Sequence, residues 1–94
     1  MQDVTFNDNT QAHRFELLQD GRLAARAEYR LQGDTLTFTH TEVDPAFEGQ
    51  GLGSKIARLS LDDVRRRGLK AVPRCEFIAA WIAKHPEYQD LVAS

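Results

Sequence analysis

The stretch EGQGLGS, residues 48–54, holds three of the six glycines of this 94-residue chain. It follows a turn-like DPAF at residues 44–47. Glycine lets another molecule approach the backbone closely, because it has no side chain, and it also adopts left-handed conformations readily. A slack surface loop would use glycines in the same way. The segments on either side therefore decide what this stretch does.

The sequence before the glycines has the two-residue periodicity of β-strands. Apolar side chains alternate with polar ones, and Asp-Gly and Gly-Asp pairs separate the segments, as in β-hairpins. β-branched and aromatic residues are frequent in the last of these segments. We expect an antiparallel meander with strands at residues 4–6, 13–18, 23–31 and 35–43.

Beyond the glycines the apolar residues recur three to five positions apart, as on one side of a helix, until Gly68 supplies a stop. The short apolar run at residues 69–72 predicts another strand. A second helix is expected at residues 76–85, where Pro86 ends it. We therefore expect an α+β fold, in which the first helix packs on a mostly antiparallel sheet and the second lies beyond the last strand.

Composition narrows the class of protein. The chain has a formal net charge of −2 and a single cysteine, so we expect one domain over residues 1–94 without an internal disulfide. No global positive charge favours nucleic acid or a membrane surface as a partner. The polar N-terminal residues do not resemble a signal peptide, and no cluster has the spacing of metal ligands. We expect a cytoplasmic protein, monomeric or weakly dimeric, that needs no metal.

A glycine-rich turn between a strand and a helix can bind an anion. The first N–H groups of a helix have no partner within it, and the helix dipole places partial positive charge there. The spacing is not the dinucleotide fingerprint, since Ser54 stands at the last glycine position, and Ser54-Lys55 reverses the order found in P-loops. Spacing alone supports phosphate binding and an ordinary turn equally.

The residues around the glycines resemble a known family. The segment V-x-P-x-x-E-G-Q-G-L-G-S at residues 43–54 is similar to motif A of the GNAT acetyltransferase superfamily, where it wraps the pyrophosphate of acetyl-coenzyme A. The P-x-C motif at Pro73 to Cys75 and H-P-x-Y at residues 85–88 resemble, more narrowly, a small stand-alone branch. The resemblance implies a GNAT-like fold and acetyl transfer from acetyl-coenzyme A to an amine of unknown identity.

Two departures from the family pattern affect this expectation. Glu48 stands where most members carry Arg or Gln, and an acid cannot donate to a phosphate. Binding is therefore expected to rest on backbone N–H groups, with Glu48 as a helix cap. The helices usual between the first two strands are also missing, as if only the cofactor half remained. A non-catalytic acyl-CoA-binding or interaction module is therefore the alternative.

The resemblance implies cofactor contacts on the glycine stretch and on the strand before it. Main-chain groups of Thr41 and Val43 are expected beside the pantetheine arm, and a β-bulge on this strand would free an N–H for the thioester carbonyl. Arg65–Arg67 could reach the 3′-phosphate, or simply form a solvated helix end. The residues expected at the pyrophosphate are Gln50, Gly51, Leu52, Gly53 and Ser54.

Three side chains are candidates for the chemistry. Glu42 or His40 could accept the proton of the amine, or could simply cover the sheet. Cys75 begins a helix, whose positive end favours a thiolate, and in the small branch the P-x-C setting implies an acetyl carrier. The alternatives are an inert buried thiol, or redox chemistry, for which a second cysteine is lacking. Phe77 and Trp81 are expected in the core or in a pocket wall.

Overall fold

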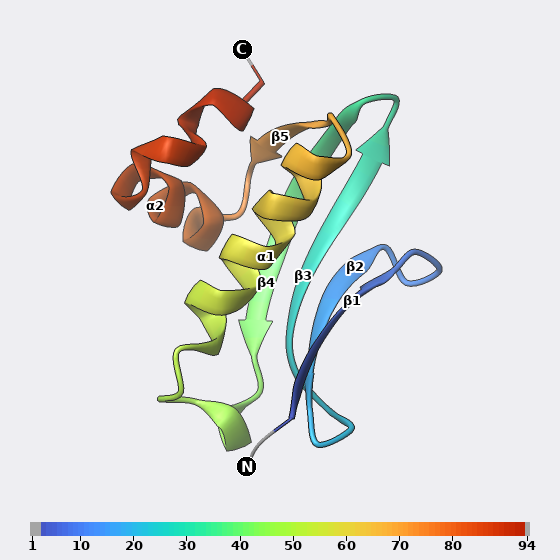
Figure 1. Ribbon diagram of the computed structural model, residues 1–94, viewed down its shortest axis with the longest axis vertical. Coiled ribbons are helices and arrows are strands. Elements are labelled where there is room, and N and C mark those ends of the chain that lie inside the picture. The colour runs from blue at the N-terminus through green and yellow to red at the C-terminus, as the bar shows by residue number, and fades with distance from the viewer. Residues whose placement is uncertain (1–2, 94) are drawn as a thin grey trace.

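The computed structural model describes residues 3–93 as a five-stranded sheet with helices on one side (Figure 1). Four strands form an antiparallel meander in chain order, and the fifth pairs with the fourth in parallel. The strands are β1 (Val4–Asn9), β2 (Arg14–Gln19), β3 (Arg22–Gln32), β4 (Thr35–Val43) and β5 (Lys70–Pro73). The helices are α1 (Leu52–Arg66) and α2 (Glu76–Lys84), with 3-10 turns η1 (Pro45–Phe47) and η2 (Pro86–Leu91). The predicted α+β arrangement is confirmed.

The bounds of the elements differ from the prediction mainly at their ends. The edge strand runs to Asn9 instead of residue 6, because it pairs along the whole of β2. The last strand lies one residue later, and the last helix ends one residue earlier. The sequence did not predict η2, which continues the chain after Pro86. No helix within residues 3–93 is long and apolar enough to cross a membrane.

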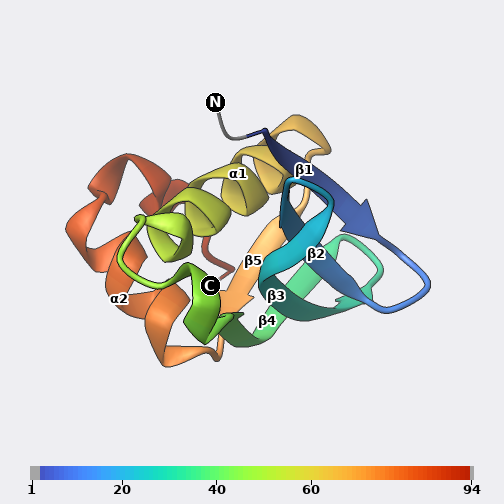
Figure 2. The ribbon, with the colours of Figure 1, turned by 90° about the horizontal axis from the view of Figure 1, so that it is seen from below.

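The apolar side of α1 packs against one face of the sheet, and α2 lies beside α1, past the β4–β5 side of the sheet (Figures 1 and 2). Ile56, Leu61 and Val64 of α1 are fully buried, and each such side chain contributes about 1.5–3 kcal/mol on transfer from water. The sheet supplies Phe15, Leu17, Leu36 and Phe38 to the same core. This packing holds the glycine stretch in place at the N-terminal end of α1.

A β-bulge interrupts the pairing of β3 with β4. The register shifts between Glu28 and Tyr29, so that Thr39 is an extra residue on β4. Its hydroxyl donates to the Glu28 carbonyl at 3.3 Å. An extra residue leaves the ladder locally unpaired and bends the strand. A bulge on this strand is what the resemblance to the GNAT family implies.

The bulge reverses the faces of β4. Before it, even-numbered residues such as Phe38 are buried against α1. Beyond it the odd-numbered residues Thr41 and Val43 take that face, since each extra residue shifts the alternation by one. His40 and Glu42 therefore point to the open face of the sheet, away from α1.

A polar cluster joins β1 and β3 to the end of α1. The Tyr29 hydroxyl donates to Asp8 Oδ1 at 2.6 Å, and Arg67 donates to Asp8 at 2.9 Å and to Asp63 at 3.0 Å. Burial raises the pKa of the Tyr29 hydroxyl, and the hydrogen bond to Asp8 and the charge of that carboxylate raise it further. A raised pKa in the folded state stabilises the fold below the unfolded pKa of about 10, and the contribution is lost as the pH rises above it.

We therefore expect the free energy of unfolding to fall above about pH 10, and Tyr29→Phe to weaken this dependence. Near neutral pH the same substitution should cost about 1 kcal/mol, because one hydrogen bond is lost. Urea unfolding followed by circular dichroism at a series of alkaline pH values measures both effects. Tyr88→Phe is the comparison: the hydrogen bond to Asp62 raises the pKa of Tyr88 as well, but that hydroxyl lies at the surface, so the slope should change less than in Tyr29→Phe. If the free energy of unfolding of Tyr29→Phe fell as steeply with alkaline pH as that of the parent protein, the effect would not come from Tyr29.

Candidate cofactor and transfer site

The first turn of α1 starts from the glycine stretch without a side-chain cap. Gly51 is the N-cap residue, with φ 73° and ψ 18°, and no side chain accepts a hydrogen bond from the turn. Gly49 is also left-handed, with φ 84°. These two positions favour glycine because of their backbone conformation. The first N–H groups of α1 remain available, and no acidic residue stands in the first turn.

The prediction that Glu48 caps α1 is wrong. Glu48 ends η1 instead, and its own N–H donates to the Pro45 carbonyl at 3.4 Å. The two left-handed glycines that follow carry the chain away from this residue before the helix begins at Leu52. The N-cap residue directly precedes the first residue of a helix. That residue is Leu52 here, so Gly51 is the N-cap and Glu48 lies too far away.

The first turn of α1 opens on a hollow of about 440 Å³ between the glycine stretch and α2. Most of the predicted cofactor residues line it, namely Val43, Gly51, Leu52, Gly53 and Ser54. Gln50 is exposed and Thr41 half-buried, and neither lies in the lining. The remaining walls are Phe47, Glu48, Gly49, Phe77, Trp81, Lys84 and His85.

Side chains near the C-terminal end of α2 contact the first turn of α1. The Trp81 indole N–H donates to Ser54 Oγ at 2.9 Å, and the His85 ring stacks on the indole with a centroid distance of 3.8 Å. Phe77 is 42% exposed, and a Cβ at Gly53 would lie 2.9 Å from its ring. Glycine at 53 therefore lets the phenyl ring lie against α1. Phe77 and Trp81 form a pocket wall, which is one of the two places predicted for them.

Sequence reasoning missed two polar residues of the hollow, Lys84 and His85. Both lie three or four positions after Trp81, so that a helical turn brings them to the same side of α2. This spacing was the available signal. The His85 Nδ1 atom lies 2.7 Å from the Trp81 carbonyl oxygen, which fixes the ring and leaves Nε2 as its other polar atom.

Cys75 lies where β4 and β5 part. The pairing of these strands ends at Phe38 and Pro73, and the Cys75 N–H donates to the Phe38 carbonyl at 3.0 Å. The residue is the N-cap of α2, is 8% exposed, and its thiol donates to Thr41 Oγ1 at 3.3 Å. The start of α2 is the place that the sequence predicts for Cys75, while its role as an acetyl carrier stays a prediction.

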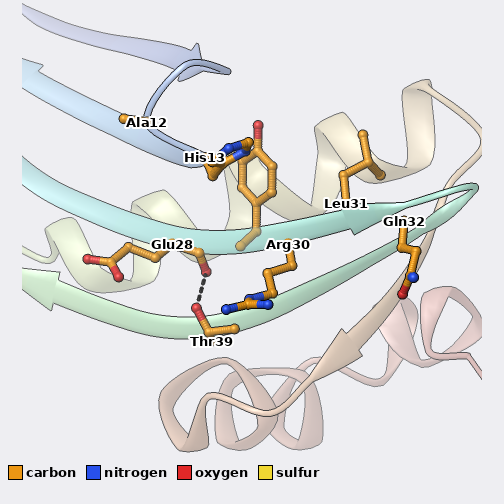
Figure 3. A pocket seen from close by; sticks show the side chains of 8 residues that line it. Ala12, His13, Glu28, Arg30, Leu31, Gln32 and Thr39 are labelled. Atoms are coloured by element: carbon orange, nitrogen blue, oxygen red, sulfur yellow. Dashed lines mark hydrogen bonds between the residues drawn. The ribbon is translucent and has the colours of Figure 1, made fainter.

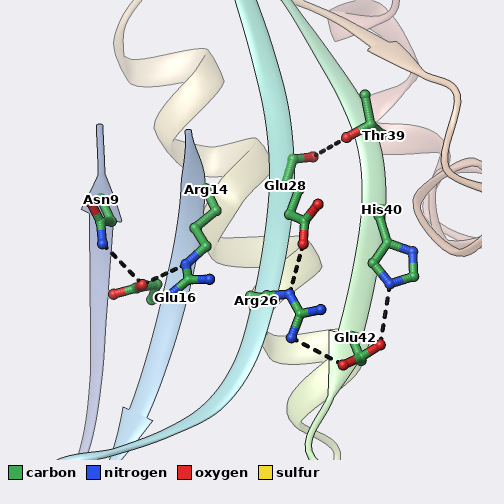
Figure 4. A network of polar contacts seen from close by, with 8 residues as sticks. All are labelled: Asn9, Arg14, Glu16, Arg26, Glu28, Thr39, His40 and Glu42. Carbon is green, nitrogen blue, oxygen red and sulfur yellow. Dashed lines mark hydrogen bonds and ion pairs between the residues drawn. The ribbon is translucent and has the colours of Figure 1, made fainter. Parts of the chain in front are cut away.

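His40 and Glu42 meet on the open face of the sheet (Figure 4). His40 Nε2 lies 3.3 Å from Glu42 Oε1, and the other carboxylate oxygen accepts from Arg26 at 3.0 Å. The hydrogen bond from His40 and the charge of Arg26 hold the pKa of Glu42 below its ordinary value. A carboxylate whose pKa is lowered binds a proton weakly near neutral pH and is therefore a weak general base. His40 is therefore the better candidate for a base.

The three predicted catalytic residues do not lie together in one site. Cys75 contacts Thr41, whose side chain is on the α1 face of β4, whereas His40 and Glu42 project from the opposite face. Neighbouring residues of a strand point to opposite faces. A direct Cys–His pair is thus absent, and the thiol and the candidate base stand on two sides of one strand.

Arg65–Arg67 lie at the other end of α1 from the glycine stretch. Arg65 binds Asp90 and the Glu87 carbonyl at 2.9–3.0 Å. The 15-residue helix separates these residues from the first turn by about 22 Å at 1.5 Å per residue. These arginines form ion pairs at the C-terminal end of α1. The interpretation that they reach the 3′-phosphate is wrong. No cluster of three metal-binding side chains occurs within residues 3–93.

The meander, the parallel fifth strand and the uncapped glycine start of α1 define a GNAT-like α+β protein. The sequence profile described as GCN5-related N-acetyl-transferase matches residues 14–91. The chain therefore belongs to the GCN5-related N-acetyltransferase family, as motif A at residues 43–54 predicts. Members of this family generally use acetyl-coenzyme A.

Two curated relatives are similar over part of their length. Protein NATD1 of Xenopus tropicalis is 35% identical over 52 residues, which is 55% of this chain and 48% of that protein. The [Ribosomal protein bS18]-alanine N-acetyltransferase of Escherichia coli K12 is 34% identical over 55 residues, 58% of this chain and 37% of the relative. The matches thus span about half of these relatives or less.

Two solved structures share the fold. An NMR structure of a GCN5-like protein from Staphylococcus aureus has a TM-score of 0.70 at 22% identity, covering 98% of this chain and 88% of the other. The crystal structure of the ribosomal-protein-S18-alanine N-acetyltransferase of Escherichia coli has a TM-score of 0.60 at 21% identity, covering 74% and 63%. Similarity at this level establishes the architecture.

Proposed function

We propose that this protein binds acetyl-coenzyme A and transfers the acetyl group to an amine. The uncapped first turn of α1, opening on the hollow of about 440 Å³, carries the proposal. Free N–H groups and the positive end of a 15-residue helix suit a pyrophosphate. Bound acetyl-coenzyme A would supply the acetyl group as a thioester.

The residues of the hollow fit the parts of this molecule. The N–H groups of Leu52, Gly53 and Ser54 would hold the pyrophosphate, and Lys84 of α2 would bind the 3′-phosphate. Val43 and the exposed Phe77 offer an apolar surface for the pantetheine arm. Glu48 is the single acid of the lining, so binding rests on main-chain groups and on α2.

Cys75 would act as the acetyl carrier. Its thiolate attacks the thioester carbonyl, the bond to the coenzyme A sulfur breaks, and that sulfur leaves as a thiolate that takes up a proton. The acceptor amine then attacks the acetyl-cysteine and loses a proton, and the Cys75 thiolate is released. The Thr41 hydroxyl, 3.3 Å from the sulfur, positions it. In a direct transfer, His40 would instead take the proton of the amine.

The proposal is tested by incubating the protein with acetyl-coenzyme A and a panel of amino acids, peptides and polyamines. Release of free coenzyme A above the rate in buffer supports transfer. The non-catalytic alternative has one observation in its favour, because a short turn at residues 10–13 joins β1 to β2, where the resemblance to the superfamily implies helices. Calorimetric binding of coenzyme A without any release of thiol would favour that alternative.

Lys84→Gln is expected to weaken coenzyme A binding about fivefold and to leave dephospho-coenzyme A binding unchanged. An exposed ion pair contributes up to about 1 kcal/mol, which corresponds to this factor. We place the 3′-phosphate beside Lys84 because it is the cationic side chain of the hollow outside the helix turn. Isothermal titration calorimetry with both ligands measures the difference. Lys55→Gln is the control, since Lys55 does not line the hollow; equal weakening of both ligands would contradict the placement.

A further inference from the structure

A second hollow, of about 660 Å³, lies at the end of the sheet where the β1–β2 hairpin stops and the β3–β4 hairpin continues (Figure 3). None of the predicted site residues lines it. We call it the β3 groove. Its lining residues are Ala12, His13, Glu28, Tyr29, Arg30, Leu31, Gln32 and Thr39.

One edge of β3 is open along the groove. Pairing of β3 with β2 ends at Glu28, opposite Arg14, whereas pairing with β4 continues to Gln32. The Tyr29 N–H still donates to the His13 carbonyl at 2.9 Å, so this amide points away from β4.

Strand residues two apart present their amides to the same side, so the N–H and C=O of Leu31 point to this open edge as well. No strand within residues 3–93 pairs with β3 there. Leu31 is 44% exposed, because β3 extends beyond the cover of the β1–β2 hairpin.

The groove carries unneutralised positive charge. The Glu28 carboxylate accepts from Arg26 at 2.7 Å and is therefore already paired. Arg30 projects from the same face two residues further on and makes no ion pair with any residue that the structure describes. A ligand with a carboxylate would complement it.

The groove also adjoins the candidate base. Arg26 bridges Glu28 to Glu42, and Glu42 contacts His40, so a continuous polar chain runs from the groove to the imidazole (Figure 4). Thr39, the residue of the β-bulge, lines the groove itself. A molecule in the groove therefore lies near His40, the candidate base for a direct transfer, whereas the Cys75 thiol lies on the other face of β4.

We propose that the β3 groove binds an extended peptide carrying an acidic side chain, and that this peptide belongs to the acetyl acceptor. Its main chain would pair with the open edge at Leu31, as in β-strand addition, and its carboxylate would bind Arg30. The open backbone edge selects a peptide over a small amine, since a small amine has no main chain to pair. The inference rests on the proposed function for the acceptor role, and names the acceptor as a protein chain.

The test uses two end-blocked hexapeptides rich in threonine and valine, one with a central glutamate and one with glutamine in its place. Amide chemical shifts of the ¹⁵N-labelled protein are followed during titration. The glutamate peptide should shift the amides of residues 29–32 saturably and slow hydrogen exchange at Leu31. The glutamine peptide should bind about fivefold more weakly, since it lacks the ion pair.

Arg30→Gln should remove the difference between the two peptides, whereas Arg58→Gln, which changes an exposed arginine of α1, should preserve it. Coenzyme A binding is measured for every variant, so that loss of the groove and loss of the cofactor site are told apart. Equal binding of both peptides to the parent protein would overturn the proposal. So would concentration-dependent protection of Leu31 without peptide, because a second copy would then occupy the edge.

Discussion

Incubation with acetyl-coenzyme A alone is expected to add about 42 Da to the protein, one acetyl group, and Cys75→Ala is expected to prevent it. Exchange between two thioesters is close to isoenergetic, so acetyl-cysteine should accumulate when no amine competes. Intact-mass spectrometry measures the added mass, and digestion locates it. This is the largest effect that we predict, since the only cysteine of the chain is removed.

The position of the thiol gives the physical reason. The sulfur lies between the parting strands β4 and β5, at the start of α2, and contacts a hydroxyl instead of a carboxylate. Coenzyme A binding should persist in Cys75→Ala, because the hollow at the first turn of α1 does not include residue 75. Thr41→Val should slow acylation without preventing it, because the hydroxyl only positions the sulfur.

A direct transfer would give a different result. The protein would gain no mass, and Cys75→Ala would still acetylate an amine. His40→Gln would then abolish the release of coenzyme A in the presence of that amine. Cys75 would in that case be an inert thiol, as its exposed fraction of 8% also permits.

Ser54→Glu is expected to weaken coenzyme A binding by at least about thirtyfold while leaving the fold as stable or slightly more stable. The carboxylate would stand at the first turn of α1, where no acid stands now and where it would repel the pyrophosphate. The same charge interacts favourably with the helix dipole, by about 0.3–1 kcal/mol. Calorimetry measures the affinity, and thermal unfolding measures the stability.

Ser54→Ala is the matched control. It removes the acceptor of the Trp81 indole N–H but keeps the backbone N–H of residue 54. Coenzyme A should therefore bind Ser54→Ala within about threefold of the parent protein, a change of less than 1 kcal/mol. Undiminished binding in Ser54→Glu would place the pyrophosphate elsewhere and remove the first turn of α1 from the site.

Much of the fold was predictable because its signals are local. Alternation along residues 35–43 gave a strand with the observed bounds, and the glycine stretch gave the start of α1. The place of Cys75 followed from Pro73 and the short strand before it. Such patterns depend on neighbours in the chain, and backbone conformation and helix periodicity follow from them directly.

Parts of the site could not be predicted, because they depend on register. The bulge at Thr39 decides which residues of β4 face α1, and so it separates Cys75 from His40. The resemblance implied a bulge, but one residue more or less would exchange the two faces. The error at Glu48 has a local cause, because two left-handed glycines separate this residue from the start of α1 at Leu52.

The sequence by itself determined the order of strands and helices, the glycine-rich turn at the start of α1 and membership of the GNAT superfamily. Only the tertiary structure decided that Lys84 and His85 share a hollow with Ser54, that Arg65–Arg67 are paired far from it, and that β3 has an open edge at Leu31. These features join residues distant in the chain. Packing of α1 and α2 against a twisted sheet sets such distances, and no local pattern encodes them.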